Sequence, residues 1–454
     1  MIPPHMRDPF RLRENGTDVR TEVVAGLTIF FSMAYIIIVN PSILADAGME
    51  WGAVFLATLI AAISGTLIMS LVANVPFAQA PGLGMSSFFT VTVCLTMGFT
   101  WQQALSMVFI CGLLNIVITV TKVRGMIIAA IPESVQNALS GWIGLFIAFM
   151  GLINVDLIVF DGVPQLGNLA DPTILLFLFG LLTVVVLHLL KIRGSMIISM
   201  ILVTVISLLL GQTTMYSSIS LSESLSALPS TFGVIFTSEG IPSLFSEVTL
   251  IPVVLVTVMS FCLVDMFDTI GTFIATGRRS GIFSEEEMST GGGKGFRSRM
   301  SRALLADSCA TSIGAVVGTS NTTTVVESLT GVEAGGRTGL TSLVVVICLF
   351  ATMFLAPAVS LIPTSATSAI LVMVGILMMS SFANIDWNDI EEVLPAFFAG
   401  FFMAICYNIS YGIAFALFMY VLVKVCRRRW RDVHPVLWGV VILFLVDLIL
   451  LAMM

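Results

Sequence analysis

Residues 318–332 read GTSNTTTVVESLTGV, and this stretch decides how the chain is organised. The polar run SNTTT at 320–324 leads into a segment of helical character that carries Glu327 and ends at Gly331. The flanking sequence is apolar enough to cross a bilayer, where polar groups are costly unless they face protein or a water-filled cavity. Secondary transporters hold small solutes at the N-termini of such broken helices. We therefore predict that this stretch is half of a substrate site.

The composition is that of a membrane protein. Of the 454 residues, 57% are hydrophobic and 10% are charged, and the mean hydropathy is +1.05. A soluble protein of this size needs a more charged surface, so we predict an all-α polytopic membrane protein. The chain has no basic field for nucleic acid. The cysteines show no metal-ligand spacing, and we predict no metal, no cofactor and no enzymatic activity.

Apolar runs follow one another along the whole chain. We expect spans at about 22–40, 52–74, 101–121, 135–153, 173–190, 195–211, 250–275, 302–317, 338–357, 365–381 and, split near Asn408, 391–424. A second broken crossing is expected at 76–94, PFAQAPGLGMSSFFTVTVC, because its prolines and glycines cannot continue a helix. With the break at 318–332, this makes about fourteen crossings.

The domain organisation follows from these spans. We expect a cytoplasmic N-terminal segment (1–21), a first transmembrane repeat (22–211), a connector (212–248), a second repeat (249–425) and a basic segment with an apolar C-terminal helix (426–454). With fourteen crossings, every basic cluster lies on one side, and the positive-inside rule makes that side, with the N-terminus, cytoplasmic. The expected location is the plasma or inner membrane. The apolar tail 436–453 is either an extra crossing or an in-plane helix.

Two short matches indicate an internal repeat. IPES at 131–134 precedes a span that ends in NVD, and IPTS at 362–365 precedes a span that ends in NID. Each half also holds one broken crossing. Because seven is odd, two seven-crossing repeats must be inverted relative to each other, a known transporter arrangement.

Three acids lie at membrane depth without a basic partner in the same segments. Asp265 and Asp268 are three residues apart in VMSFCLVDMFDTIGT and so share a helix face, and Glu327 is the third. One reading is that the aspartates are neutral acids that cap or cross-link helices. The reading we favour is a cation-coupled carrier for a neutral solute rich in N–H donors, because carboxylates accept such hydrogen bonds and buried carboxyls carry protons.

Several motifs resemble those of the AzgA-like purine permeases, within the nucleobase–ascorbate transporter superfamily. They are NGTDVRTEVVAGLTIFFSMAYIIIVNPSIL (15–44), APGLGMSSFF (80–89), VDMFDTIGT (264–272), GTSNTTTVVESLTGVEAGGRTGL (318–340) and IDWNDIEEVLPAFF (385–398). The resemblance implies two inverted repeats arranged as a core and a gate domain, a homodimer, and proton-driven uptake of a purine bound between the half-helices.

The resemblance also implies roles for individual residues. Glu327 matches the family's substrate-binding glutamate, Asp265 the acid that faces the ligand, and Asp268 its partner one turn further on. Ser86 stands where the family commonly has Asn, which leaves the purine preference open. We expect half-helix N–H groups near Ser86 and in residues 323–326 to bind the purine, so the remaining predicted contacts are Thr323, Thr324 and Val326. Asp265 and Asp268 are expected to share the coupling proton.

Other functions remain as alternatives. An anion exchanger or channel on a related scaffold would have a basic residue in one of the two half-helices, and none is present. An intramembrane hydrolase needs two opposed carboxyls, whereas Asp265 and Asp268 share one helix. Among carriers, one for xanthine or for a pyrimidine such as uracil is the nearest alternative, and Na⁺ is the alternative to H⁺ as the coupling ion. The preferred purine, hypoxanthine, guanine or adenine, is not determined by the sequence.

Overall fold

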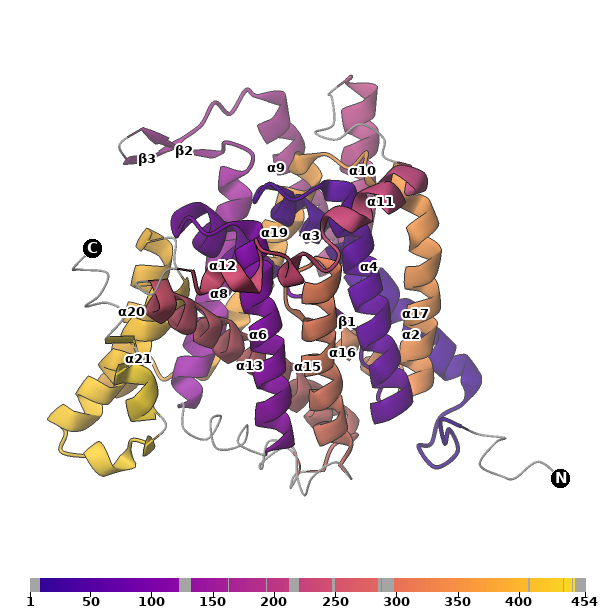
Figure 1. The fold of residues 1–454 in the computed structure, drawn as a ribbon. Helices are drawn as coiled ribbons and strands as arrows, with labels where there is room; N and C mark the ends of the chain where they lie inside the picture. Colours follow the sequence, from indigo (N-terminus) through magenta and orange to yellow (C-terminus); the bar gives the residue numbers. More distant parts are fainter. Residues whose placement is uncertain are drawn as a thin grey trace.

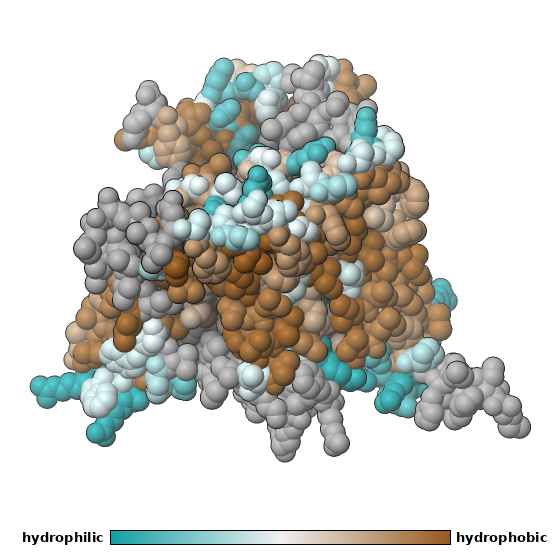
Figure 2. All heavy atoms as spheres, viewed as in Figure 1, coloured by the Kyte–Doolittle hydropathy of each residue, from teal (hydrophilic) through white to brown (hydrophobic). Residues whose placement is uncertain are grey.

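A computed structural model of the chain describes residues 9–121, 132–161, 163–192, 194–211, 220–246, 250–284, 287, 298–406, 409–435, 437–442 and 444–445. Its helices stand side by side in one block (Figure 1). An apolar band runs around the visible face, with hydrophilic residues gathered above and below it (Figure 2). Within the described ranges, nine helices are long and apolar enough to cross a membrane. The chain is therefore a multi-pass helical membrane protein.

The first half of the chain forms upright helices, one interrupted segment and one hairpin. Its elements are α2 (Val19–Met33), α3 (Ile36–Ala45), α4 (Trp51–Ile68), π-helical η1 (Met69–Ala73), β1 (Gln79–Pro81), α5 (Leu83–Ser87), π-helical η2 (Phe88–Thr96), α6 (Trp101–Val120), α8 (Glu133–Ile153), β2 (Ile158–Asp161), β3 (Val163–Leu166), α9 (Pro172–Leu189) and α10 (Ser195–Leu209).

The described part of the connector lies across one end of the block, as α11 shows (Figure 1). Its elements are α11 (Leu221–Ala227), η3 (Leu228–Ser230), η4 (Val234–Phe236) and α12 (Ile241–Leu244). The second half comprises α13 (Ile251–Ser280), α15 (Arg299–Val317), β4 (Thr322–Thr324), α16 (Ser328–Glu333), α17 (Gly339–Thr352), η6 (Met353–Leu355), α18 (Ala356–Val359), α19 (Thr364–Met378), η7 (Met379–Asn384), α20 (Ile390–Cys406), α21 (Ile409–Cys426) and η8 (Trp430–Asp432).

The two broken crossings meet in a short antiparallel sheet. Strand β1 pairs with β4, and Ala80 lies opposite Thr323. Pro81 cannot continue a helix, and the β-branched threonines of β4 favour an extended backbone. The N–H of Gly82 donates to the carbonyl of Asn321 at 3.0 Å, which extends the pairing beyond the strand. This sheet joins residues that are about 240 positions apart in the sequence.

The sheet corrects one detail of the sequence prediction. Residues 323–326 were expected at the start of a half-helix, but Thr322–Thr324 form a strand, and the helix begins only at Ser328, after Glu327. The break itself starts at Gly318, whose φ of +112° ends α15 in the left-handed region. A side chain there would be strained, and a Cβ would lie 2.4 Å from the Cβ of Thr231.

The helices pack as two groups. In the first, α15 lies against α6 and α4, and α2 lies against α17. In the second, α8 lies against α19 and α20, and α20 lies against α21. The α8–α19 contact is close, because a Cβ at Gly375 would lie 2.3 Å from the carbonyl oxygen of Gly144. The groups meet where α5 faces α8 and where α3 faces α19.

The expected membrane spans fall on helices of the structure. The domain boundaries, the number of fourteen crossings and the inverted repeat stay predictions. The interruption near Asn408 and most of the tail 436–453 lie outside the described residues, as do parts of the connector and Ile131 of the IPES motif.

Candidate functional site

A buried acid that the sequence analysis passed over lies at the centre of the site. Asp307 of α15 is fully buried. Its Oδ1 accepts from the backbone N–H of Thr324 at 2.8 Å and from the Thr324 hydroxyl at 3.0 Å. The hydroxyl of Thr269, on α13, donates to Oδ2 at 2.7 Å. The Gln79 amide of β1 reaches Oδ1 at 3.4 Å. Asp307 thus ties both strands and two helices together.

Thr323 and Thr324 therefore point into this network. The hydroxyl of Thr323 lies 3.3 Å from Asp307 Oδ1 and 2.8 Å from the hydroxyl of Thr269. Both threonines are buried. Their side chains contact Asp307, and their role as purine contacts stays a prediction. Asp307 could have been found from the sequence, because an aspartate inside the apolar span after Arg302 is costly unless it has a function.

The two aspartates of α13 have different surroundings. Asp265 is fully buried, and its Oδ2 accepts from the Asn115 amide of α6 at 2.7 Å. Asp268 is partly buried, and its charged neighbour is Asp307. The two aspartates lie three residues apart on α13, and that they act on one helix face stays a prediction. The acid that interacts with Asp268, however, comes from α15.

Ser86 belongs to a buried polar cluster between the two broken crossings. Its hydroxyl donates to Asn40 Oδ1 and lies 2.7 Å from the hydroxyl of Ser320. The Asn40 amide donates in turn to Thr58 at 2.7 Å and to Thr319 at 3.0 Å. The backbone N–H of Ser86 bonds the carbonyl of Gly82 within the helix at 2.9 Å. Ser86 therefore fixes α5 against α3 and against the residues before β4.

Glu327 lies at the N-cap of α16 and is partly exposed. The hydroxyl of Tyr35, in the turn between α2 and α3, donates to its Oε1. Among the described side chains only Tyr35 donates to this carboxylate, and the backbone N–H of Glu327 itself is a further donor. Next to it, the side chain of Val326 is 56% exposed. The site thus offers a partly exposed carboxylate beside an apolar side chain.

The structure brings most of the predicted residues to the same region around β1 and β4. Tyr35, Asn40, Asn115 and Asp307 join them, and the sequence analysis named none of these four. Asparagines inside apolar spans are a usable signal, because a buried amide needs partners. A tyrosine gives a weaker signal, because an aromatic side chain in a span is ordinary core. Among the described residues, no group of three His, Cys, Asp or Glu side chains has the arrangement of a metal site.

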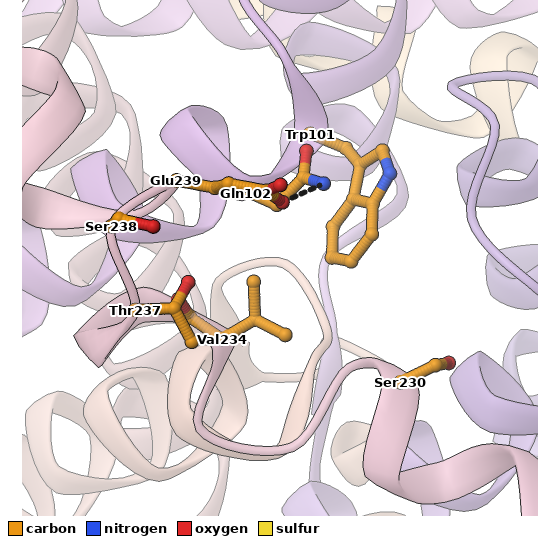
Figure 3. Close-up of a pocket in the computed structure, with 7 residues that line it drawn as sticks. All are labelled: Trp101, Gln102, Ser230, Val234, Thr237, Ser238 and Glu239. Atoms are coloured by element: carbon orange, nitrogen blue, oxygen red, sulfur yellow. Dashed lines mark hydrogen bonds between the residues drawn. The ribbon is translucent and has the colours of Figure 1, made fainter.

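A separate cavity of about 290 Å³ opens at the surface, at the start of α6. Its lining includes Trp101 and Gln102 of α6 and connector residues such as Val234 and Glu239, with Glu239 beside Gln102 (Figure 3). The Gln102 amide donates to Glu239 at 3.0 Å. None of the predicted site residues lines this cavity.

Comparison with known proteins identifies the family. Residues 20–415 match the permease family Xan_ur_permease. The chain is 40% identical to the guanine/hypoxanthine permease PbuO of Bacillus subtilis (strain 168), over 97% of this chain and all of that one. It is 36% identical to the adenine permease AdeP of Escherichia coli (strain K12), over 97% of this chain and 95% of that one.

Solved structures support the fold. The transmembrane domain of the cyanobacterial bicarbonate transporter BicA matches 89% of this chain and 96% of its own, with a TM-score of 0.62 and 14% identity. At this identity the likeness concerns the fold alone. The relatives are permeases rather than enzymes, and the family match spans most of the sequence. The chain therefore belongs to the permease family, within the nucleobase transporters whose purine permeases it resembles in sequence.

Proposed function

We propose that the protein imports purine nucleobases by proton symport. The observation that supports this most directly is the Glu327 carboxylate, which is partly exposed and accepts a hydrogen bond from the Tyr35 hydroxyl at Oε1. A purine presents ring and exocyclic N–H groups, and a carboxylate accepts from such donors more strongly than a neutral acceptor does. The names of the relatives, guanine/hypoxanthine permease and adenine permease, agree with this substrate class.

The coupling proton is assigned to the acids beside the substrate. Two carboxylates that interact in a buried site cannot both ionise at low cost, so one of them takes up a proton readily. Asp268 precedes Thr269, whose hydroxyl donates to Asp307, and Asp265, bonded to Asn115, lies three residues before Asp268 on α13. We assign the proton to this group of three acids and not to one residue. Na⁺ is the alternative coupling ion.

Transport in this proposal moves the two helix groups against each other. The group that contains α2, α4, α6, α13, α15 and α17 carries the site residues and acts as the core. The group of α8–α10 and α19–α21 acts as the gate. The two groups arise from two inverted seven-crossing repeats, with the N-terminus in the cytoplasm. The chain is proposed to assemble as a homodimer.

The test is uptake of labelled hypoxanthine in cells that lack their own purine permeases. We expect saturable uptake that a protonophore abolishes, and a loss of at least tenfold in kcat/KM for Glu327→Gln, because an amide offers the purine N–H groups a weaker, neutral acceptor. Glu50→Gln, the same change at an exposed position, is the matched control. Unlabelled guanine, adenine, xanthine and uracil as competitors rank the substrates. Absence of purine uptake by a well-expressed wild type would contradict the proposal.

A further inference from the structure

A buried glutamate outside the proposed transport chemistry connects α2 to the start of α17. Glu22 lies in the first turn of α2 and is fully buried. Its Oε1 accepts from the backbone N–H of Arg337 at 2.8 Å. Its Oε2 accepts from the hydroxyls of Thr338 and Thr341 at 2.8 and 2.6 Å. The backbone N–H groups of the same two threonines lie 3.3 and 3.1 Å from Oε2.

These contacts make Glu22 a cap for a helix to which it does not belong. The first N–H groups of a helix have no partner within it, and a negative charge is favourable at that end. Thr338 is the N-cap of α17, and Glu22 binds the N–H groups around it. The Arg337 guanidinium turns back to the carbonyls of Val332 and Gly336, both at 2.7 Å. The turn between α16 and α17 is thus held from two sides.

The face of α2 that carries Glu22 also packs against α16, up to the proposed site. A Cβ at Gly336 would lie 2.9 Å from the Cβ of Ala25. A Cβ at Gly331 would lie 2.3 Å from the side chain of Ile29. Ser32 lies 3.2 Å from the hydroxyl of Thr330. Positions 22, 25, 29 and 32 recur at intervals of three and four and therefore lie on one helix face.

We propose that Glu22 is a positioning residue for transport: it fixes the α16–α17 turn on α2 and so sets where the Glu327 carboxylate stands. This inference rests on the proposed function, in which Glu327 binds the purine. Helix α16 has six residues and is too short to hold its own place. The turn that follows its far end is fixed by the Glu22 contacts, and Glu327 at its near end accepts from the Tyr35 hydroxyl.

The experiment compares Glu22→Gln with wild type and with Glu50→Gln, each reconstituted at equal protein amounts. The amide replaces one acceptor oxygen by a donor that faces other donors. We expect the KM for the transported purine to rise about tenfold, with the maximal rate changed less than the KM. A second readout is the maleimide labelling rate of Val326→Cys, next to Glu327, in the Cys426→Ser background. We expect this rate to change in Glu22→Gln and to stay at the wild-type value in Glu50→Gln.

A residue that only stabilises the fold would behave differently. In that case Glu22→Gln would lower the melting temperature and the yield but leave the KM and the labelling rate of the folded protein unchanged, and this result would overturn the proposal. Should Glu22→Gln not fold, Thr341→Val removes one donor and keeps the side-chain shape. We expect it to change both readouts in the same direction by a smaller factor, and wild-type values for both would overturn the proposal. If wild type transports no purine, the proposed function fails, while the labelling rate still decides whether Glu22 positions α16.

Discussion

The hydroxyl of Tyr35 determines how the Glu327 carboxylate is presented to a ligand. It donates to Oε1 from outside the broken crossing and so fixes one oxygen of the carboxylate that is proposed to bind the substrate. A hydrogen bond to a charged group contributes about 1.5–3 kcal/mol. A carboxylate held this way loses less side-chain entropy when a purine binds. Tyr35 therefore acts on the ligand through Glu327.

Removing the Tyr35 hydroxyl is expected to weaken purine transport. We expect Tyr35→Phe to lower kcat/KM for the purine by about tenfold, because Glu327 loses its donor while the ring keeps its packing. The measurement is uptake kinetics at matched expression. A folded variant with wild-type kinetics would show that Tyr35 does not orient the carboxylate.

Asp307 shows why some site residues escape a sequence reading. Its side chain accepts hydrogen bonds from Thr269, Thr323, Thr324 and Gln79, on three other elements. None of these partners lies within eleven positions of it in the sequence. The acid is visible in the sequence, but its importance depends on partners that only the folded chain supplies.

The close contact between helices α2 and α16 depends on Gly331, which has no side chain. Gly331 lies in α16, where a Cβ would come 2.9 Å from the carbonyl of Ala25 as well as 2.3 Å from Ile29. Overpacking of this kind typically costs about 1–3 kcal/mol. The two helices can only be this close because position 331 is glycine.

We accordingly expect Gly331→Ala to move α16 away from α2 and to reduce purine uptake at least tenfold, with a lower melting temperature, since the added methyl group must displace Ile29 or the backbone. Gly439→Ala is the control, because a Cβ there meets no atom within 4 Å. Uptake and thermal unfolding of the two variants are compared side by side. Equal behaviour would mean that the α2–α16 spacing does not matter for transport.

For the whole molecule, the question is whether the two helix groups move against each other. They meet where α5 faces α8, and a Cβ at Gly84 would lie 2.8 Å from Ile143 Cγ2. Cysteines at these two positions would link the groups through a disulfide bond when oxidised. A rigid link across the interface must stop any transport cycle that requires the groups to separate or slide.

The prediction is that oxidised Gly84→Cys/Ile143→Cys does not transport purine and that dithiothreitol restores uptake. Each single variant, treated with the same oxidant, controls for the native cysteines. Cross-linking is checked by mass spectrometry of the bridged peptides. Wild-type uptake by the fully cross-linked protein would contradict movement of a core against a gate.

The sequence by itself determined that this is a helical multi-pass membrane protein, where its crossings break, and which family it belongs to. These features depend on local properties: apolar runs, prolines and glycines, and short motifs. The position of Asp307 depends on partners on other elements. The strand pairing of β1 with β4 and the contacts of Tyr35 and Glu22 depend on residues hundreds of positions apart. Their partners are set by the packing of the helices, so only the tertiary structure decided them.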